Sequence, residues 1–226
     1  MLTCPVIPLT QPDKPLRRDA ERNRQRILDA ARELFAEEGL GATLNDIAHH
    51  AGVGVGTVYR RFPDKTVLIE ELFEQRLEDL VRVATGDLDD PDAWHGLKTF
   101  LQRAMELQAD DRGVKDLITA STDGLDRVAK IRDRLLPIGV ELVRRAREAG
   151  QIRGDIDAPD LPVIQLMLST LIDASRDVSP DLWRRYLGII TRGLSAHPDQ
   201  EPELETAPLA PDQVDKVMSY LRPARR

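Results

Sequence analysis

Four residues near position 60 have the types and the spacing to recognise a nucleic acid. If residues 53–61 form a helix, then Gly56, Thr57, Arg60 and Arg61 share its outward arc. Glycine permits close approach, threonine can meet a thymine methyl group or a phosphate, and arginine can bond guanine or phosphate. The pattern therefore predicts a helix whose exposed face enters the major groove of DNA.

The opposite side of this helix has to pack against the rest of the protein. Val55, Val58 and Phe62 fall within about 60° of one another, and Pro63 stops the helix. Tyr59 borders this apolar arc, so its ring could pack in the core or its hydroxyl could reach a phosphate. Two arginines alone would more often be solvated surface, so the interpretation depends on the whole ordered set.

Two further helices are needed to position this one. An amphipathic helix is expected from residue 17 to Gly39, because apolar residues recur there with a period of 3.6. Thr43 is expected to cap a second helix together with Asp46, and Gly52 to end it with a left-handed turn. Two helices joined by a tight turn to a third predict a helix-turn-helix unit.

Residues 24–68 resemble the N-terminal signature of the TetR family of transcriptional regulators. The spacing agrees without gaps over about a fifth of the chain, and the matching residues are Arg24, Ile27, Leu28, Asp29, Ala30, Ala31, Leu34, Phe35, Gly39, Thr43, Ile47, Ala48, Ala51, Gly52, Val53, Gly56, Thr57, Val58, Tyr59, Phe62, Lys65 and Leu68. Gly54 stands where the family usually has a hydroxyl residue, and Arg61 where it often has histidine or another aromatic residue. These two departures leave the operator sequence undecided.

The resemblance implies a set of residues at the DNA. Thr43, Tyr59 and Lys65 would contact phosphates, Lys65 beside the N-terminus of a long helix capped by Asp64. The third helix would face bases or the adjacent backbone. The residues expected at the DNA are Arg24, Thr43, Val55, Gly56, Thr57, Tyr59, Arg60, Arg61 and Lys65.

The rest of the chain is also expected to be helical, so the predicted fold class is all-α. Helices are expected at residues 64–84, 92–108, around 114–120, 126–149, 158–174 and 180–196, with a turn-rich break at 150–155. The expected organisation is a disordered tail at 1–16, a helix-turn-helix DNA-binding domain at 17–63, a helical effector-binding and dimerisation domain at 64–196, and a tail at 197–226. In that last tail, residues 197–211 read as a linker before a short helix around 213–221.

The last two large helices are apolar over more than one side, which indicates burial on more than one side. In the TetR family such a pair forms a four-helix bundle across a two-fold axis, and a palindromic operator also favours a homodimer. A large core within a monomer is the alternative. The residues expected at the dimer interface are Ile164, Leu168, Leu171, Tyr186, Leu187, Ile190 and Leu194.

The middle helices are expected to enclose a cavity for a small-molecule effector of unknown identity, mainly apolar with a few polar groups. Any one of the candidates is more often ordinary core than part of a cavity wall. The candidates are Phe100, Met105, Leu107, Leu117, Ile118, Leu136 and Met167. Repression is the common mode of the family, so release of the operator by the effector is the expected mechanism.

Composition and missing motifs exclude several other classes. The chain has 41% hydrophobic and only 4% aromatic residues, which favours helices over a β-sandwich. Its net charge of -7 argues against a basic coat protein, although the first 62 residues hold nine Lys and Arg against eight Asp and Glu. No stretch approaches the roughly 20 apolar residues of a membrane span. Cys4 cannot form an internal disulfide and no signal peptide is evident, so a cytoplasmic protein is expected.

No enzymatic site is recognisable in the sequence. A nucleophile elbow, a P-loop, a dinucleotide fingerprint and a metal-spaced His/Cys set are all missing, so no catalytic residue, cofactor or metal is expected. His49 and His50 would point about 100° apart and could not readily share a metal. Two alternatives stay open: a ligand-independent architectural DNA-binding protein, and a helical small-molecule-binding or enzymatic domain with a vestigial reader.

Overall fold

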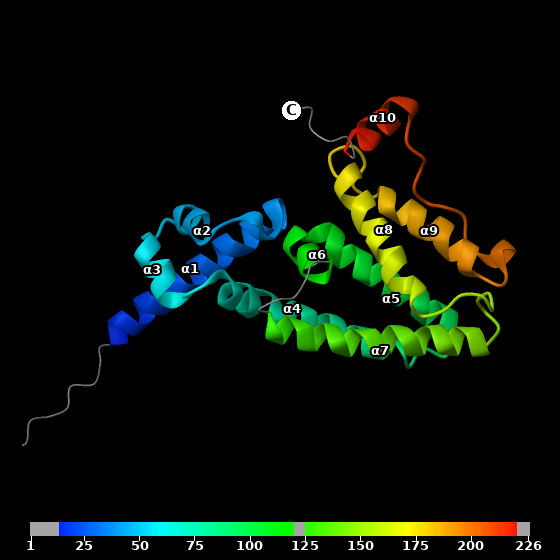
Figure 1. Cartoon of the computed structure of the whole chain (residues 1–226), viewed down its shortest axis with the longest axis horizontal. Coiled ribbons are helices and arrows are strands. Elements are labelled where there is room, and N and C mark those ends of the chain that lie inside the picture. Colours follow the sequence, from blue (N-terminus) through cyan, green and yellow to red (C-terminus); the bar gives the residue numbers. More distant parts are fainter. Residues whose placement is uncertain (1–13, 120–124, 221–226) are drawn as a thin grey trace, which may run out of the picture.

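Helices form nearly all the regular structure in the computed structural model, which describes residues 14–119 and 125–220. The elements in chain order are α1 (Lys14–Glu38), the 3-10 turn η1 (Gly39–Gly41), α2 (Leu44–Ala51), α3 (Val55–Arg61), α4 (Lys65–Asp87), α5 (Ala93–Asp110), α6 (Arg112–Thr119), α7 (Asp126–Glu148), α8 (Asp160–Ser175), α9 (Leu182–Leu194), η2 (Pro198–Gln200) and α10 (Pro211–Ser219) (Figure 1). No strand occurs among the described residues, only an isolated bridge between Ile152 and Ser195. The all-α expectation is confirmed.

The helix ends lie within three residues of those expected from residue 64 onward. At the N-terminus, α1 begins at Lys14, inside the tail expected at 1–16, and the rest of that tail lies outside the described residues. In the parts of the chain that the structure describes, no helix combines the length and apolar composition that crossing a bilayer requires.

The first three helices pack into a small unit that we call the reader (residues 14–63). The apolar stripe of α1 packs on α2, which in turn packs on α3, and the side chains at the centre of this unit are fully buried. These central residues are Ile27, Ala31, Phe35, Ile47, Val58 and Phe62. Burial of the stripe fixes the orientation of α3, which is too short to be stable alone.

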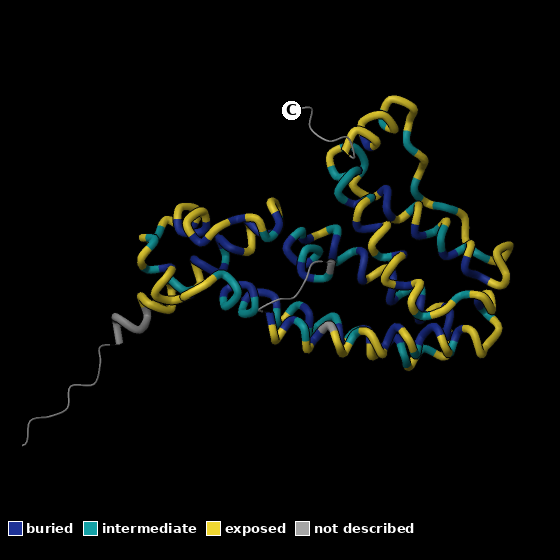
Figure 2. Tube along the Cα trace, in the orientation of Figure 1, coloured by how far each residue is buried: buried dark blue, intermediate teal, exposed yellow. Residues whose placement is uncertain are grey.

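The remaining helices form what we call the body (residues 64–119 and 125–220). α4 leaves the reader and lies beside α7 along one edge of the molecule, and α5 packs between α7 and α8 (Figure 1). Buried residues follow the inner sides of these helices, whereas long exposed stripes remain on α7 and α8 (Figure 2). The helix α4 thus connects the reader to the core of the body directly.

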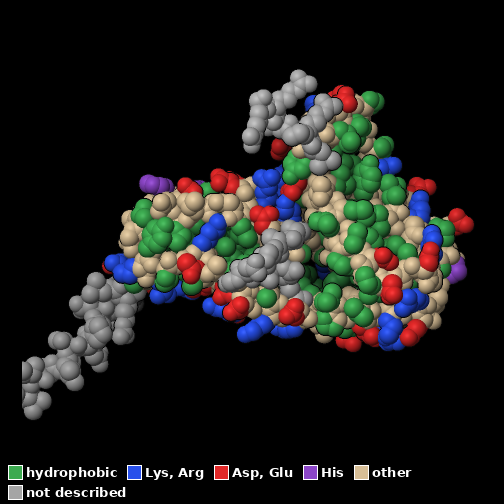
Figure 3. All heavy atoms as spheres, in the orientation of Figure 1, with side chains coloured by type: hydrophobic (Ala, Val, Ile, Leu, Met, Phe, Trp, Pro, Cys, Tyr) green, Lys and Arg blue, Asp and Glu red, His purple; other side chains and the backbone are tan. Residues whose placement is uncertain are grey.

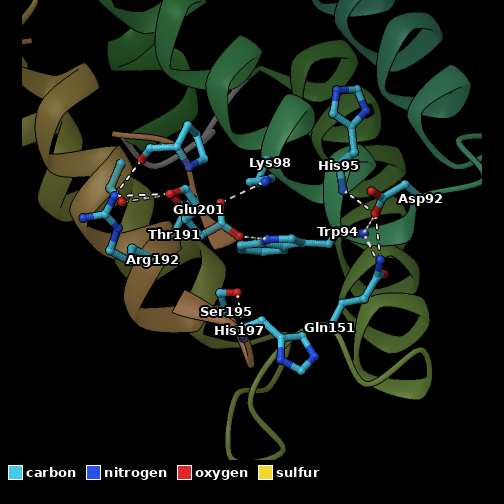
Figure 4. A network of polar contacts seen from close by, with 12 residues as sticks. Asp92, Trp94, His95, Lys98, Gln151, Thr191, Arg192, Ser195, His197 and Glu201 are labelled. Carbon is cyan, nitrogen blue, oxygen red and sulfur yellow. Dashed lines mark hydrogen bonds and ion pairs between the residues drawn. The ribbon is translucent and has the colours of Figure 1, made fainter. Parts of the chain in front are cut away.

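The segment that reads as a linker is docked on the body instead. We call residues 198–206 the strap, which is tied to α5 and α9 (Figure 4). The indole N–H of Trp94 and the ammonium of Lys98, the latter at 2.9 Å, donate to the carboxylate of Glu201. Burial pushes the pKa of Glu201 upward, but these hydrogen bonds outweigh it and hold the pKa below its usual value. The segment that reads as a linker is therefore fixed to α5 through Glu201.

Further contacts hold the rest of the strap along α9. Arg192 donates to the carbonyl of Pro202 at 2.7 Å, and Arg185 to the carbonyl of Thr206 at 2.9 Å. Leu204 lies so close to Gly188 that a β-carbon there would approach its Cδ2 to 2.7 Å. α10 then packs on α8 with Val217 buried.

Candidate nucleic-acid interface and ligand cavity

A capping box and a left-handed glycine set the start and the end of α2. The Thr43 hydroxyl accepts from the Asp46 N–H at 3.2 Å, and the Asp46 carboxylate accepts from the Thr43 N–H at 2.8 Å. These bonds from Thr43 lower the pKa of Asp46. Gly52 follows with φ 61°, a conformation that favours glycine. The predicted caps of α2 are therefore present, and they define the turn into α3.

The outward arc of α3 is the one that the sequence predicts. Gly56, Arg60 and Arg61 are exposed, and Thr57 is half-buried. On the inner side Val58 and Phe62 are fully buried, and Val55 is half-buried against the core. Tyr59 is 46% exposed, so its hydroxyl is free to reach beyond the surface of the reader. The helix thus presents a small, hydroxylated and basic face to solvent.

Three of the residues expected at the DNA are engaged inside the protein. Arg24 forms ion pairs with Glu21, at 3.1 Å, and with Glu71 of α4. The Thr43 hydroxyl is used in the capping box and also donates to the Asp46 carboxylate at 2.7 Å. Neither side chain could bind a phosphate without giving up these contacts.

The third is Lys65. Its ammonium donates to the carbonyl of Leu40 and lies 5.7 Å from the centroid of the Phe35 ring. Burial lowers the pKa of Lys65, while the charges of Asp116 and Asp46 oppose the shift. Lys65 therefore joins the start of α4 to the turn η1 in this structure.

Sequence reasoning missed the role of Arg26. This side chain comes from the exposed side of α1, and its guanidinium donates at 2.7 Å to the carbonyl of Ala51, the last residue of α2. Cations commonly stabilise helix C-termini. A periodic pattern cannot indicate such a contact, because the partner lies 25 residues away.

The apolar face on the outside of α8 and α9 shares only Tyr186 with the expected dimer interface. Val163, Leu166 and Met167 on α8 are 56%, 56% and 54% exposed, and Tyr186 and Ile189 on α9 are each 43% exposed. Figure 3 shows hydrophobic side chains gathered over α8. We call these five residues the outer face.

Most of the residues expected at a dimer interface are buried within the single chain. Leu168, Ile164, Leu187 and Leu194 are between 2% and 7% exposed and belong to the core. Leu171 and Ile190 are half-buried, and Tyr186 alone belongs to the outer face. Since α8 is apolar on two sides, the sequence pattern could not tell which side faces the core.

A cavity of about 230 Å³ lies between α5, α7 and α8. Phe100, Ile118 and Leu136 line it as expected. Met105 and Leu117 are instead fully buried core, and Leu107 packs half-buried against that core. Met167 cannot contribute either, because α8 turns Leu161 and Gln165 toward the cavity and Met167 to the outer face.

One polar pair interrupts the apolar wall. Gln108 lines the cavity and has no exposed surface, and the hydroxyl of Ser169 donates to its amide oxygen. The amide nitrogen donates to the carbonyl of Ala104 at a long 3.3 Å. An amide has two N–H donors, so one more hydrogen bond to a bound molecule is available.

Two family models match the chain over separate segments. Residues 27–72 match the model described as bacterial regulatory proteins, tetR family. Residues 91–196 match the model described as the C-terminal domain of SbtR-like transcriptional regulators. The first match covers most of the reader and the beginning of α4, and the second covers α5 to α9.

Curated relatives and solved structures agree with these matches. The HTH-type transcriptional regulator SrpR from Pseudomonas putida is 31% identical over 144 residues, which are 62% of this chain and 68% of that protein. An HTH-type transcriptional regulator from Staphylococcus aureus is 31% identical over 112 residues, and this chain spans only 60% of its length. The crystal structure of the TetR transcriptional regulator SCO0520 from Streptomyces coelicolor is 31% identical, with 76% of this chain and 98% of that chain covered and a TM-score of 0.51.

Proposed function

The chain belongs to the TetR family of bacterial transcriptional regulators, and we propose that it is a cytoplasmic homodimeric repressor released from a palindromic DNA operator by a small-molecule effector. Its function is then regulatory rather than enzymatic, since the family consists of transcriptional regulators. The observation that carries the proposal is the outward face of α3.

The arginines of α3 are available for a ligand outside the protein. Within the described residues, no hydrogen bond or ion pair engages the side chain of Arg60 or Arg61, although most other arginines of the reader are paired. Both follow Thr57 on a helix fixed by Val58 and Phe62. Exposed arginines on a rigid helix can bond guanine edges or phosphates in the major groove.

The outer face supports the homodimer. Its five large apolar side chains are exposed in the single chain, and they lie on the two helices that would meet their symmetry mates in a four-helix bundle. Two readers are also required for two half-sites about 34–36 Å apart. A monomer would leave this apolar surface in water.

The cavity supports an effector that is mainly apolar. Phe100, Leu161 and Val140 would surround its body, and the Gln108 amide would hold one polar group. Because α5, α6, α7 and α8 all contribute walls, a bound molecule could change the packing among them.

The test is selection of bound DNA from a random pool, followed by footprinting on the enriched sequence. A palindrome protected on two successive major grooves is the expected result. Protection without sequence preference would instead support an architectural DNA-binding protein. No enrichment at all would support a helical domain with a vestigial reader.

A further inference from the structure

The short helix α6 lies where the body meets the reader (Figure 1). Two of its side chains hold the backbone at the end of α1. The carboxylate of Asp116 accepts from the Leu40 N–H at 2.8 Å, and Arg112 donates to the carbonyl of Glu37 at 2.7 Å. Through these two side chains α6 is hydrogen-bonded to the reader.

The packing around α6 leaves no room for substitution at two glycines. A β-carbon on Gly113 would come within 2.6 Å of the Phe73 ring and 2.9 Å of Phe35 Cβ. Gly39 has φ 74°, and the Asp116 carboxylate occupies the space where its β-carbon would stand. At Gly113, α6 therefore packs on side chains of α1 and α4 with no space for a further carbon atom, and a shift of α6 must move these side chains.

The peptide groups on both sides of Leu40 are held from different helices. Its N–H is bonded to Asp116 of α6, and its carbonyl to Lys65 at the start of α4. Leu40 stands three residues before the Thr43 cap of α2. If the Asp116 carboxylate moves, Leu40 has to move with it. The movement of Leu40 would then shift both Lys65 at the start of α4 and the cap at the start of α2.

The other side of α6 faces the cavity. Ile118 lines the cavity and lies two residues after Asp116, about 200° around the helix. Lys115 in the same helix pairs with Asp173 of α8. A molecule in the cavity would press on one side of α6 while the opposite side holds Leu40.

We propose that Asp116 is the positioning residue through which occupancy of the cavity is transmitted to the reader, by way of its hydrogen bond to the Leu40 N–H. This inference rests on the proposed control by an effector. The bond from the Leu40 N–H to Asp116 acts beside the Arg112 bond to Glu37 and the packing of Gly113. It can be removed by itself, without touching the DNA face or the cavity.

A side chain can replace the unidentified effector in the experiment. A β-carbon on Gly139 would lie 3.5 Å from Leu161 Cδ1 and 3.8 Å from Phe100 Cε1, so Gly139→Leu adds atoms between these two walls of the cavity. Gly139→Ala is the control, because it adds only the tolerated β-carbon. Operator affinity is measured by fluorescence anisotropy on the selected DNA for each variant, alone and combined with Asp116→Ala or Asp116→Asn.

Gly139→Leu is expected to weaken operator binding about tenfold, which corresponds to about 1.4 kcal/mol. In the Asp116→Ala background the same change is expected to weaken it less than twofold. Asp116→Asn keeps an acceptor oxygen and should restore most of the effect. An equal tenfold loss in all three backgrounds would overturn the role of Asp116. If Gly139→Leu leaves the affinity of the otherwise native dimer unchanged, control through this cavity fails, and the inference fails with it.

Amide hydrogen exchange gives a readout that needs no cavity variant. Asp116→Ala should speed exchange at Leu40 at least tenfold and leave the core amide of Ile47 unchanged, whereas Asp116→Asn should stay close to the native rate. Unchanged exchange at Leu40 in Asp116→Ala would also overturn the proposal. If Gly139→Leu does not fold, Leu136→Trp replaces it, because Leu136 is 64% exposed on the lining of the same cavity.

Discussion

The guanidinium of Arg26 in α1 donates to the carbonyl oxygen of Ala51, the last residue of α2, at 2.7 Å. A second bond at 3.3 Å reaches the carbonyl of Gly52, whose left-handed conformation turns the chain toward α3. The first helix of the reader therefore fixes the end of the second and, through it, the direction of the third. A residue that points away from the reading face thus controls where that face lies.

Removal of this contact should weaken DNA binding from a distance. Arg26→Ala is expected to lower the free energy of unfolding of the reader by about 1 kcal/mol and to weaken operator binding, because the turn before α3 loses its support. Urea unfolding and anisotropy would measure the two effects. Arg32→Ala is the control, since Arg32 pairs with the half-buried Asp29 of the same helix and supports no turn. Equal operator affinity for the two variants would contradict the role of Arg26.

Substitutions on the outward arc of α3 should act on the operator alone. Arg60→Ala and Thr57→Ala are each expected to cost about 1–3 kcal/mol of operator binding if they remove a base contact, with no change in the unfolding midpoint. The control is Arg153→Ala, which removes an arginine from a turn of the body where it pairs with Asp155. If both α3 variants keep the native affinity, then another surface reads the DNA.

The two sides of α8 should respond differently to the same charge. Leu166→Glu places a carboxylate on the outer face and is expected to give a folded monomer, because a buried unpaired charge in the dimer is costly. Leu168→Glu buries the charge in the core of the chain and should prevent folding. Sedimentation velocity and circular dichroism would separate these outcomes. A stable Leu166→Glu dimer would place the interface elsewhere.

Acid should weaken the N-terminal caps of α2 and α4, because both caps depend on a carboxylate. Hydrogen bonds from Thr43 lower the pKa of Asp46, and those from Thr66 and the Val67 N–H lower the pKa of Asp64. Both carboxylates have folded pKa values below 3.8, so their stabilisation is complete above about pH 4 and is lost as the pH falls through the folded values. Thermal melts at decreasing pH should show a smaller loss for Asp46→Asn than for the native chain. Identical pH dependence of the two would reject this account.

Removal of the carboxylate at position 201 should release the strap from α5. Glu201→Ala leaves the Trp94 indole N–H and the Lys98 ammonium without their partner, so water is expected to reach Trp94, which is now only 6% exposed. In a Trp183→Phe background the fluorescence of Trp94 should shift to longer wavelength. Glu203→Ala, which changes an exposed strap residue, should leave the emission unchanged. An unshifted spectrum for Glu201→Ala would mean that the strap stays docked.

The sequence predicts well where a local rule decides the structure. Helical periodicity placed Val58 inside and Arg60 outside, and the Thr43 and Asp46 spacing predicted the capping box. The sequence predicts poorly where a side chain has two possible binding partners. The ammonium of Lys65 could bind a phosphate or the carbonyl of Leu40. Only the tertiary fold brings that carbonyl within reach, so the sequence alone could not predict the contact.

Two further differences have the same origin. Leu168 and Leu166 are the same residue type on one helix that is apolar on two sides, so composition could not assign one to the core and the other to the surface. The strap has the Pro- and Glu-rich composition of a linker, yet Glu201 finds partners about a hundred residues earlier in the chain. Such distant pairs leave no periodic signal.

The close approach of Leu204 in the strap to Gly188 in α9 should make the two positions evolve together. A larger side chain at position 188 would push the end of Leu204 aside and weaken the contact between α9 and the strap. Among descendants of a common ancestor, glycine at 188 should therefore be favoured in lineages that keep the strap. In lineages that have lost the strap, larger residues should be tolerated at position 188. This covariation would reveal the docked strap in related sequences without a structure.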